Sequence, residues 1–198
     1  MESKSLGNNI AHLMVATDVL FTNEEIDRIV AQGINLQADE AIINTKDNGS
    51  KVKHSTRTCK IGWFYPNQDT NWLFDKMIDL IGNINENYFK FDLNQFEPLQ
   101  FTSYDSSRKE FYGQHMDCSM GIPHATASRK LSITLQLSSG DDYEGGDLLL
   151  YQSKEPAIAP KKKGQLVVFP SYVLHEVTPV TKGTRYSLVT WVHGPMFR

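Results

Sequence analysis

The stretch RKLSITLQL at residues 129–137 alternates between polar and apolar side chains. Because successive side chains of a strand point to opposite faces, the pattern predicts one apolar face and one polar face. The apolar face would consist of Leu131, Ile133, Leu135 and Leu137, and the polar face of Ser132, Thr134 and Gln136. We therefore expect the apolar row to pack against helices and the polar row to line a pocket.

Similar short runs continue on both sides of this stretch from Phe96 onward, separated by clusters of Gly, Pro, Asp and Ser. This pattern is typical of an antiparallel sandwich or barrel. We expect strands near 98–104, 109–117, 129–138, 146–151, 164–169, 172–177 and 184–193. The predicted fold class is mainly β with flanking α: a double-sheet jelly roll with N-terminal helices packed on one sheet.

The first half of the chain is expected to be mainly helical. Thr22 and Glu25 have the spacing of a capping box, and the helix that follows should end at Gly33. A second helix is expected after Thr70, where apolar residues recur every three or four positions. The polar stretch 44–55 looks like a mobile loop. We expect one domain over 1–198, with a helical support in 1–95 and the β core in 96–193.

Composition excludes several classes of protein. The 198 residues are 40% hydrophobic and 22% charged, as in an ordinary globular protein, and a net charge of −3 argues against a nucleic-acid partner. No segment reaches the ~18 consecutive apolar residues of a membrane span. Cys59 and Cys118 have no metal-ligand spacing and predict neither a disulfide framework nor a zinc site. With no secretory signal recognisable, a reducing, cytoplasmic location is expected.

His115 and Asp117 are two residues apart in a run that reads as a strand, so their side chains should share a face. His175, in another short apolar strand, is the best third ligand, with His124 as its competitor. Two imidazoles and one carboxylate form the facial triad that leaves positions open on non-heme Fe(II). An isolated His-x-Asp also occurs by chance, and a surface salt link would then explain it.

Arg185 follows His175 by ten residues, across a predicted hairpin turn at 179–183, so the two could face each other on neighbouring strands. A buried guanidinium needs an anion, and its planar fork matches a carboxylate. Ser187 shares the face of Arg185 and could donate to the same carboxylate, while Trp191 would close the pocket against water. A surface arginine after a turn is the alternative.

In this order, His115, Asp117, His175 and Arg185 resemble the ligand set of the prolyl 4-hydroxylase-type 2-oxoglutarate/Fe(II) oxygenases. The segments 129–137, 142–148, 168–171 and 183–185 are similar to bacterial members of that family, over roughly 96–193. The resemblance implies a double-stranded β-helix that binds Fe(II) at His115, Asp117 and His175. It further implies hydroxylation of a C–H bond with oxoglutarate and O2 as cosubstrates, succinate and CO2 as co-products, and ascorbate as a reductant.

The resemblance also implies further residues of the cosubstrate site. Tyr104 matches a family tyrosine that hydrogen-bonds the distal carboxylate of oxoglutarate, although a barrel-wall aromatic would explain it equally well. Trp191 matches a tryptophan near the active site of some relatives, and Thr134 of the polar row completes the expected cosubstrate site. Since related halogenases have a small residue where Asp117 stands, hydroxylation is the expected outcome.

The substrate implied by the resemblance is a prolyl residue in a peptide or protein, with the stretch 44–58 as a lid over it. A free amino acid or another small molecule stays open as the substrate. Two other kinds of protein also stay open, namely a non-catalytic metal-binding jelly roll and a cupin-like enzyme without oxoglutarate. Arg185 together with Ser187 favours the oxygenase over both.

Overall fold

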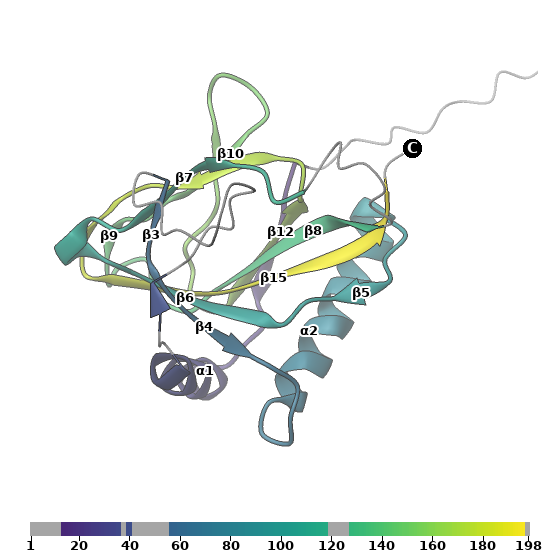
Figure 1. Ribbon diagram of the computed structural model, residues 1–198, viewed down its shortest axis with the longest axis horizontal. Coiled ribbons are helices and arrows are strands. Elements are labelled where there is room, and N and C mark those ends of the chain that lie inside the picture. The colour runs from purple at the N-terminus through teal and green to yellow at the C-terminus, as the bar shows by residue number, and fades with distance from the viewer. Residues whose placement is uncertain (1–12, 37–38, 41–55, 119–126, 197–198) are drawn as a thin grey trace, which may run out of the picture.

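Two antiparallel β-sheets face each other in a double-stranded β-helix, and two helices cover the outer face of the larger sheet (Figure 1). The computed structural model describes residues 13–36, 39–40, 56–118 and 127–196. This arrangement confirms the fold class expected from the alternating runs.

The larger sheet has eight strands. Across the sheet the order is β1 (Val15–Val19), β12 (Gln165–Pro170), β8 (Ala127–Gln136), β15 (Thr184–Pro195), β6 (Leu99–Asp105), β4 (Lys60–Phe64) and β2 (Asp39–Glu40), with β5 (Gln95–Phe96) also paired to β15. The decisive stretch 129–137 therefore lies mostly in β8, a central strand flanked by β12 and β15.

The smaller sheet has five strands, in the order β11 (Ala157–Ile158), β10 (Leu148–Tyr151), β13 (Leu174–Val177), β7 (Phe111–His115) and β3 (Arg57–Thr58). A separate ribbon pairs β14 (Val180–Lys182) with β9 (Glu144–Gly145), and a short 3-10 turn, η2 (Ser106–Arg108), precedes β7. All seven expected strands are present, and each begins and ends within two residues of its expected bounds.

The expected hairpin at 179–183 was wrong. These residues form β14, which pairs with β9, so the chain leaves the smaller sheet at β13 and enters the larger sheet at β15. His175 and Arg185 therefore lie on different sheets and not on neighbouring strands. The sequence could not distinguish a hairpin turn from a short strand that leads to the other sheet, because Gly and Pro occur at the ends of both.

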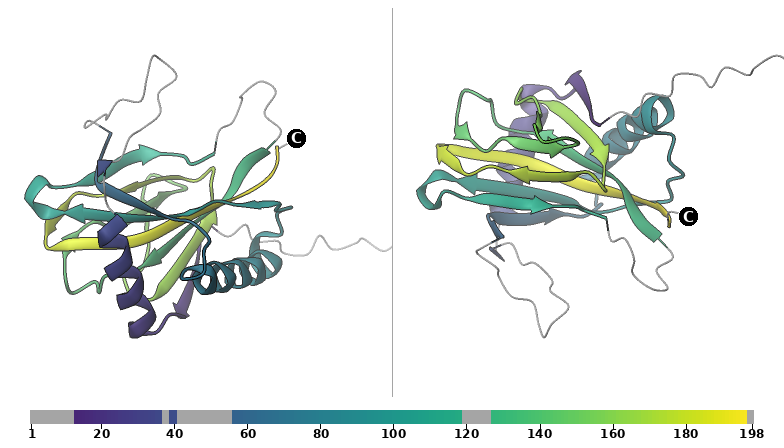
Figure 2. Two further views of the ribbon diagram at one scale, coloured as in Figure 1. Left: turned by 60° about the horizontal axis from the view of Figure 1, so that its bottom comes forward. Right: turned by 90° about the horizontal axis from the view of Figure 1, so that it is seen from above.

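Helices α1 (Asn23–Leu36) and α2 (Asn71–Ile84) pack on the larger sheet, and a π-helical turn, η1 (Asn85–Phe89), extends α2 (Figure 2). The capping box is confirmed: Glu25 N–H donates to Thr22 Oγ1 at 3.2 Å, and Thr22 N–H donates to Glu25 Oε2 at 2.8 Å. Gly33, however, does not end α1, which continues to Leu36. Gly33 is instead a packing position, since an added Cβ would lie 2.3 Å from Cδ2 of Phe101.

Two apolar clusters divide the interior. One lies between the helices and the larger sheet and contains the whole apolar row of 129–137, as expected. The other lies between the two sheets and includes Tyr104, Leu150 and Phe169. The polar row of β8 faces the space between the sheets, so the two faces of this strand separate the supporting core from the pocket.

The first half contributes strands as well as helices, which its pattern did not predict. Strands β1 to β4 are two to five residues long, too short to show a periodicity of their own, and each pairs with a strand from another part of the chain. The expected loop at 44–55 lies outside the described residues, as does most of the expected lid at 44–58, whose last two residues form β3. Within the described ranges, no helix has the length and apolar character needed to cross a membrane.

Candidate active site

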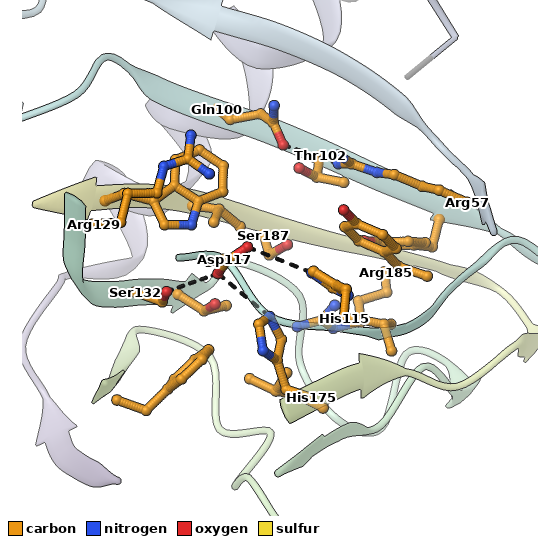
Figure 3. A pocket seen from close by; sticks show the side chains of 18 of the residues that line it. Arg57, Gln100, Thr102, His115, Asp117, Arg129, Ser132, His175, Arg185 and Ser187 are labelled. Carbon is orange, nitrogen blue, oxygen red and sulfur yellow. Dashed lines mark hydrogen bonds and ion pairs between the residues drawn. The ribbon is translucent and has the colours of Figure 1, made fainter. Parts of the chain in front are cut away.

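Three candidate metal ligands meet between the sheets. His115 ends β7, His175 lies opposite it on the paired strand β13, and Asp117 follows β7 in a bend (Figure 3). Asp117 Oδ1 lies 3.5 Å from His115 Nε2, and its Oδ2 lies 3.4 Å from His175 Nε2. Asp117 thus lies beyond the strand that was expected to carry it, yet the three donor atoms lie within 4.8 Å of one another.

Hydrogen bonds orient each ligand. Nδ1 of His115 lies 2.8 Å from the Gly113 carbonyl and Nδ1 of His175 lies 2.9 Å from the Val173 carbonyl. Since a carbonyl only accepts, each Nδ1 carries a proton, and Nε2 is the ring nitrogen that a metal would take.

The Asp117 carboxylate is held by two serines. Ser132 Oγ donates to Asp117 Oδ2 at 2.7 Å and lies 2.9 Å from Ser171 Oγ, which must donate in turn because the single Ser132 proton is already used. The backbone N–H of Asp117 donates to the Ser171 carbonyl at 2.9 Å. Both the side chain and the backbone of Asp117 are therefore fixed by the middle of β8 and by the residue that follows β12.

The protonation states suit a metal ion. Burial raises the pKa of the Asp117 carboxyl, but contacts with the His115 and His175 imidazoles outweigh burial and hold that pKa well below its usual value. Burial lowers the pKa of His115. An ionised carboxylate beside a neutral imidazole is the state that metal binding requires.

A cavity of about 340 Å³ opens beside the triad, between the two sheets. Its wall contains all of the remaining residues predicted from the sequence: Tyr104, Thr134, Arg185, Ser187 and Trp191. Arg185 lies opposite Tyr104 across the β15–β6 pair, with its guanidinium carbon 5.7 Å from the tyrosine ring centre.

Several buried polar atoms of this cavity have no hydrogen-bond partner within the described part of the chain. They are Nε of Arg185, which is only 3% exposed, Nε1 of Trp191 and Oγ1 of Thr102. Buried donors are normally paired, so an orphaned guanidinium N–H indicates space for a ligand that carries an acceptor. A dicarboxylate such as oxoglutarate fits this donor, and two imidazoles with one carboxylate fit non-heme Fe(II).

The cavity also contains residues that the sequence interpretation missed. Tyr112 stacks on His115 with ring centres 3.5 Å apart, and Arg129 stacks on Trp191 at 3.8 Å while pairing with Glu97 at 2.6 Å. Gln100 and Thr102 precede Tyr104 by four and two residues on the same face of β6, a spacing that could have revealed them. Arg57 gave no such signal, because β3 has only two residues.

Two other histidines of the sequence, His124 and His193, do not belong to the triad. His124, the competing third ligand, lies outside the described residues. His193 lies on β15 and contacts Glu97, which also binds Arg129. Among the described residues, His115, Asp117 and His175 form the one cluster with the geometry to hold a metal ion.

A family model described as the 2OG-Fe(II) oxygenase superfamily matches residues 99–193. The matched residues, just under half of the chain, are similar to that superfamily. The match covers β6 to β15 and therefore every predicted ligand of the 2OG-Fe(II) oxygenase site, which confirms the family indicated by the sequence motifs.

Curated relatives of this oxygenase region are similar over part of their length. A PKHD-type hydroxylase of Acinetobacter baumannii is 39% identical over 100 residues, which are 49% of this chain and 43% of the relative. A PKHD-type hydroxylase of Synechococcus sp. is 38% identical over 84 residues, which are 42% of this chain and 38% of the relative. The matched region thus spans about two-fifths of the length of these relatives.

Solved structures share the fold over nearly the whole chain. A prolyl-4-hydroxylase of Pseudomonas putida has a TM-score of 0.72 at 22% identity and covers 93% of this chain and 94% of its own. A viral collagen prolyl hydroxylase from Paramecium Bursaria Chlorella virus-1, in a 2OG complex, has a TM-score of 0.71 at 16% identity and covers 92% and 97%. The helical support and the double-stranded β-helix therefore occur together in other proteins.

Proposed function

We propose that this 2OG-Fe(II) oxygenase is a hydroxylase that holds Fe(II) at His115, Asp117 and His175 and oxoglutarate at Arg185. The observation that carries the proposal is a buried guanidinium with an unpartnered N–H in the same cavity as the triad. In a non-catalytic metal-binding jelly roll, or in a cupin-like enzyme without oxoglutarate, this buried charge would have no anionic partner.

The residues of the cavity would have different roles, according to where they lie. When bound, iron with oxoglutarate and O2 supplies the oxidising power that converts oxoglutarate to succinate and CO2 and hydroxylates a C–H bond. Arg185 would bind the distal carboxylate through its planar fork, with Ser187, Tyr104 and Thr134 as neighbouring donors. Trp191 covers the cavity wall and would exclude water from it.

For the substrate, we propose a prolyl residue in a peptide or protein. Support comes from the prolyl hydroxylases that share the fold, one of which, from Trichoplax adhaerens, is described in complex with a peptide fragment (TM-score 0.71, 18% identity). A free amino acid or another small molecule is the alternative substrate. A reducing, cytoplasmic location is part of the proposal, and it fits the two free thiols at Cys59 and Cys118.

The test is formation of succinate from oxoglutarate with Fe(II) and O2, with and without ascorbate, followed by mass spectrometry of prolyl peptides. We expect a gain of 16 Da on a prolyl residue, in line with insertion of one oxygen atom. His175→Ala should abolish turnover and weaken Fe(II) binding by calorimetry, because one of three ligands is lost. Wild-type metal affinity in His175→Ala would exclude the proposed ligand set, and succinate without a modified prolyl peptide would exclude the prolyl substrate alone.

A further inference from the structure

A second buried guanidinium lines the cavity on the side of the smaller sheet. Arg57 begins β3, is 8% exposed and has its guanidinium carbon 4.6 Å from the ring centre of Tyr112. Tyr112 in turn stacks on the metal-ligand candidate His115. The Tyr112 ring therefore lies between Arg57 and the triad along the cavity wall (Figure 3).

The hydrogen-bond partners of Arg57 among the described residues are neutral. Its Nε donates to Cys59 Sγ at 2.9 Å and its Nη2 donates to Gln100 Oε1 at 2.9 Å. Burial raises the pKa of the Cys59 thiol, so this partner brings no compensating charge. Within the described ranges, Arg57 forms no ion pair.

Two carboxylates outside the triad have partners of their own. Glu110, buried just before β7, accepts the backbone N–H of Asp105 at 2.9 Å and lies 3.8 Å from Arg108. Glu97 is bound by Arg129 at 2.6 and 2.7 Å. Of the three arginines that line the cavity, only Arg129 has a carboxylate partner within the described part of the chain.

Among the described residues, a count of charges leaves Arg57 uncompensated even in the loaded site. Under the proposed function, the two charges of Fe(II) and that of Arg185 balance Asp117 and the two carboxylates of oxoglutarate. Arg57 then keeps one positive charge in a buried position. A buried charge is costly without a partner, so a further anion is expected at this wall of the cavity.

We propose that Arg57 binds a carboxylate of the substrate, so that the substrate is an anion whose carboxylate is recognised on the Tyr112 side of the cavity. The proposal rests on the proposed function and adds the substrate class to it. Gln100 positions the guanidinium from β6, and Tyr112 supports its face. The carboxylate belongs either to a chain terminus, as in a free amino acid, or to an acidic side chain beside the hydroxylated residue.

The test compares acids with neutral amides of the same shape. Protein loaded with Fe(II) and saturating oxoglutarate without O2 is titrated with three pairs: N-acetylproline and its amide, N-acetylglycine and its amide, and the capped dipeptides Pro-Glu and Pro-Gln. Saturating oxoglutarate keeps the probes away from Arg185. We expect at least about a tenfold preference for the acid in one pair, the effect of one charge-assisted hydrogen bond.

Arg57→Met should abolish that preference, and Arg57→Lys should keep part of it, because an ammonium retains the charge without the planar fork. Arg57→Lys also gives the answer if Arg57→Met fails to fold. The matched control is Arg28→Met, which removes a guanidinium on α1 that stacks on Trp72 outside the cavity. The control should keep the wild-type preference.

Two results would overturn the proposal: no acid preference in any pair, or an acid preference that survives Arg57→Met. A loss of oxoglutarate affinity in Arg57→Met would also overturn it, because Arg57 would then belong to the cosubstrate site. A different set of results would show that the substrate is not a prolyl residue. The proline and glycine pairs would then show the same acid preference and no prolyl peptide would gain oxygen, while the assignment of Arg57 would stand.

Discussion

At the level of single residues, the site depends on side chains that position the ligands as much as on the ligands themselves. Asp117 lies outside regular structure, in a bend, and its carboxylate is held by Ser132 on β8, which is backed by Ser171. The ligands could be predicted from sequence because only a few residue types bind Fe(II). Ser132 and Ser171 could not be recognised as their support, because a serine in a strand is common and its partner comes from tertiary packing.

Ser132→Ala should weaken metal binding without unfolding the protein. The substitution removes the hydroxyl that fixes Asp117 Oδ2, and loss of such an outer partner typically costs roughly 10- to 100-fold in metal affinity. Calorimetric titration with Fe(II) under argon measures the effect. Ser128→Ala is the matched control, since Ser128 is buried on the same strand and, among the described residues, donates only to the Arg129 carbonyl at 3.4 Å. Equal metal affinities for the two variants would show that Ser132 does not position Asp117.

At the level of elements, the contact between α1 and the larger sheet depends on a missing side chain. Gly33 lies against Phe101, which is fully buried on β6 and stacks on Tyr186 at 5.5 Å. The sequence predicted the start of α1, because a capping box is a local signal. It mispredicted the end, because a glycine that ends a helix and a glycine that admits a neighbouring ring look the same in one sequence.

Gly33→Ala should destabilise the fold although alanine is the better helix former. The gain in helix propensity is about 1 kcal/mol, whereas forcing a methyl group into a packed core typically costs about 1–3 kcal/mol. The added Cβ would lie 2.3 Å from Phe101, so we expect a packing cost near the upper part of that range and a net loss of about 2 kcal/mol. Gly82→Ala on α2 is the control, because nothing lies within 4 Å of its added Cβ, and it should stabilise. Urea unfolding of both variants decides the matter, and a stabilised Gly33→Ala would refute the packing argument.

At the level of the whole molecule, the two sheets supply different parts of the site. His115 and His175 belong to the smaller sheet, while Tyr104, Thr134, Arg185 and Ser187 belong to the larger one. The alternating runs predicted the two-sheet fold, while the motif spacing and the family resemblance indicated these residues. They could not predict which strands share a sheet, so the hairpin expected between His175 and Arg185 was wrong, and Arg57 on the short strand β3 was missed. Strand order is set by long-range pairing, which leaves no trace in local periodicity.

Because the site residues lie on two sheets, ligands bound between them should raise the thermal stability of the protein. If Arg185 holds oxoglutarate while the triad holds the metal, the cosubstrate joins the two sheets, and metal and oxoglutarate should stabilise the fold together. A ligand at about 100 times its Kd adds about 2.7 kcal/mol, which corresponds to roughly 5–10 °C in Tm for a protein of this size. Under argon, we expect Fe(II) alone to raise Tm and oxoglutarate to add a further increment that is absent without the metal.

Arg185→Leu should keep the increment from Fe(II) and lose the one from oxoglutarate. Loss of one partner of a buried charge pair costs ~2–5 kcal/mol, or roughly 30- to several-thousand-fold in affinity, which leaves oxoglutarate largely unbound at the same concentration. Arg185→Lys should fall between, because an ammonium keeps the charge but cannot form the bidentate contact. Thermal melts of the three proteins with no ligand, with the metal and with both ligands separate these effects. A wild-type oxoglutarate increment in Arg185→Leu would mean that the cosubstrate does not join the sheets through Arg185, and its site would then have to be sought at another donor of the cavity.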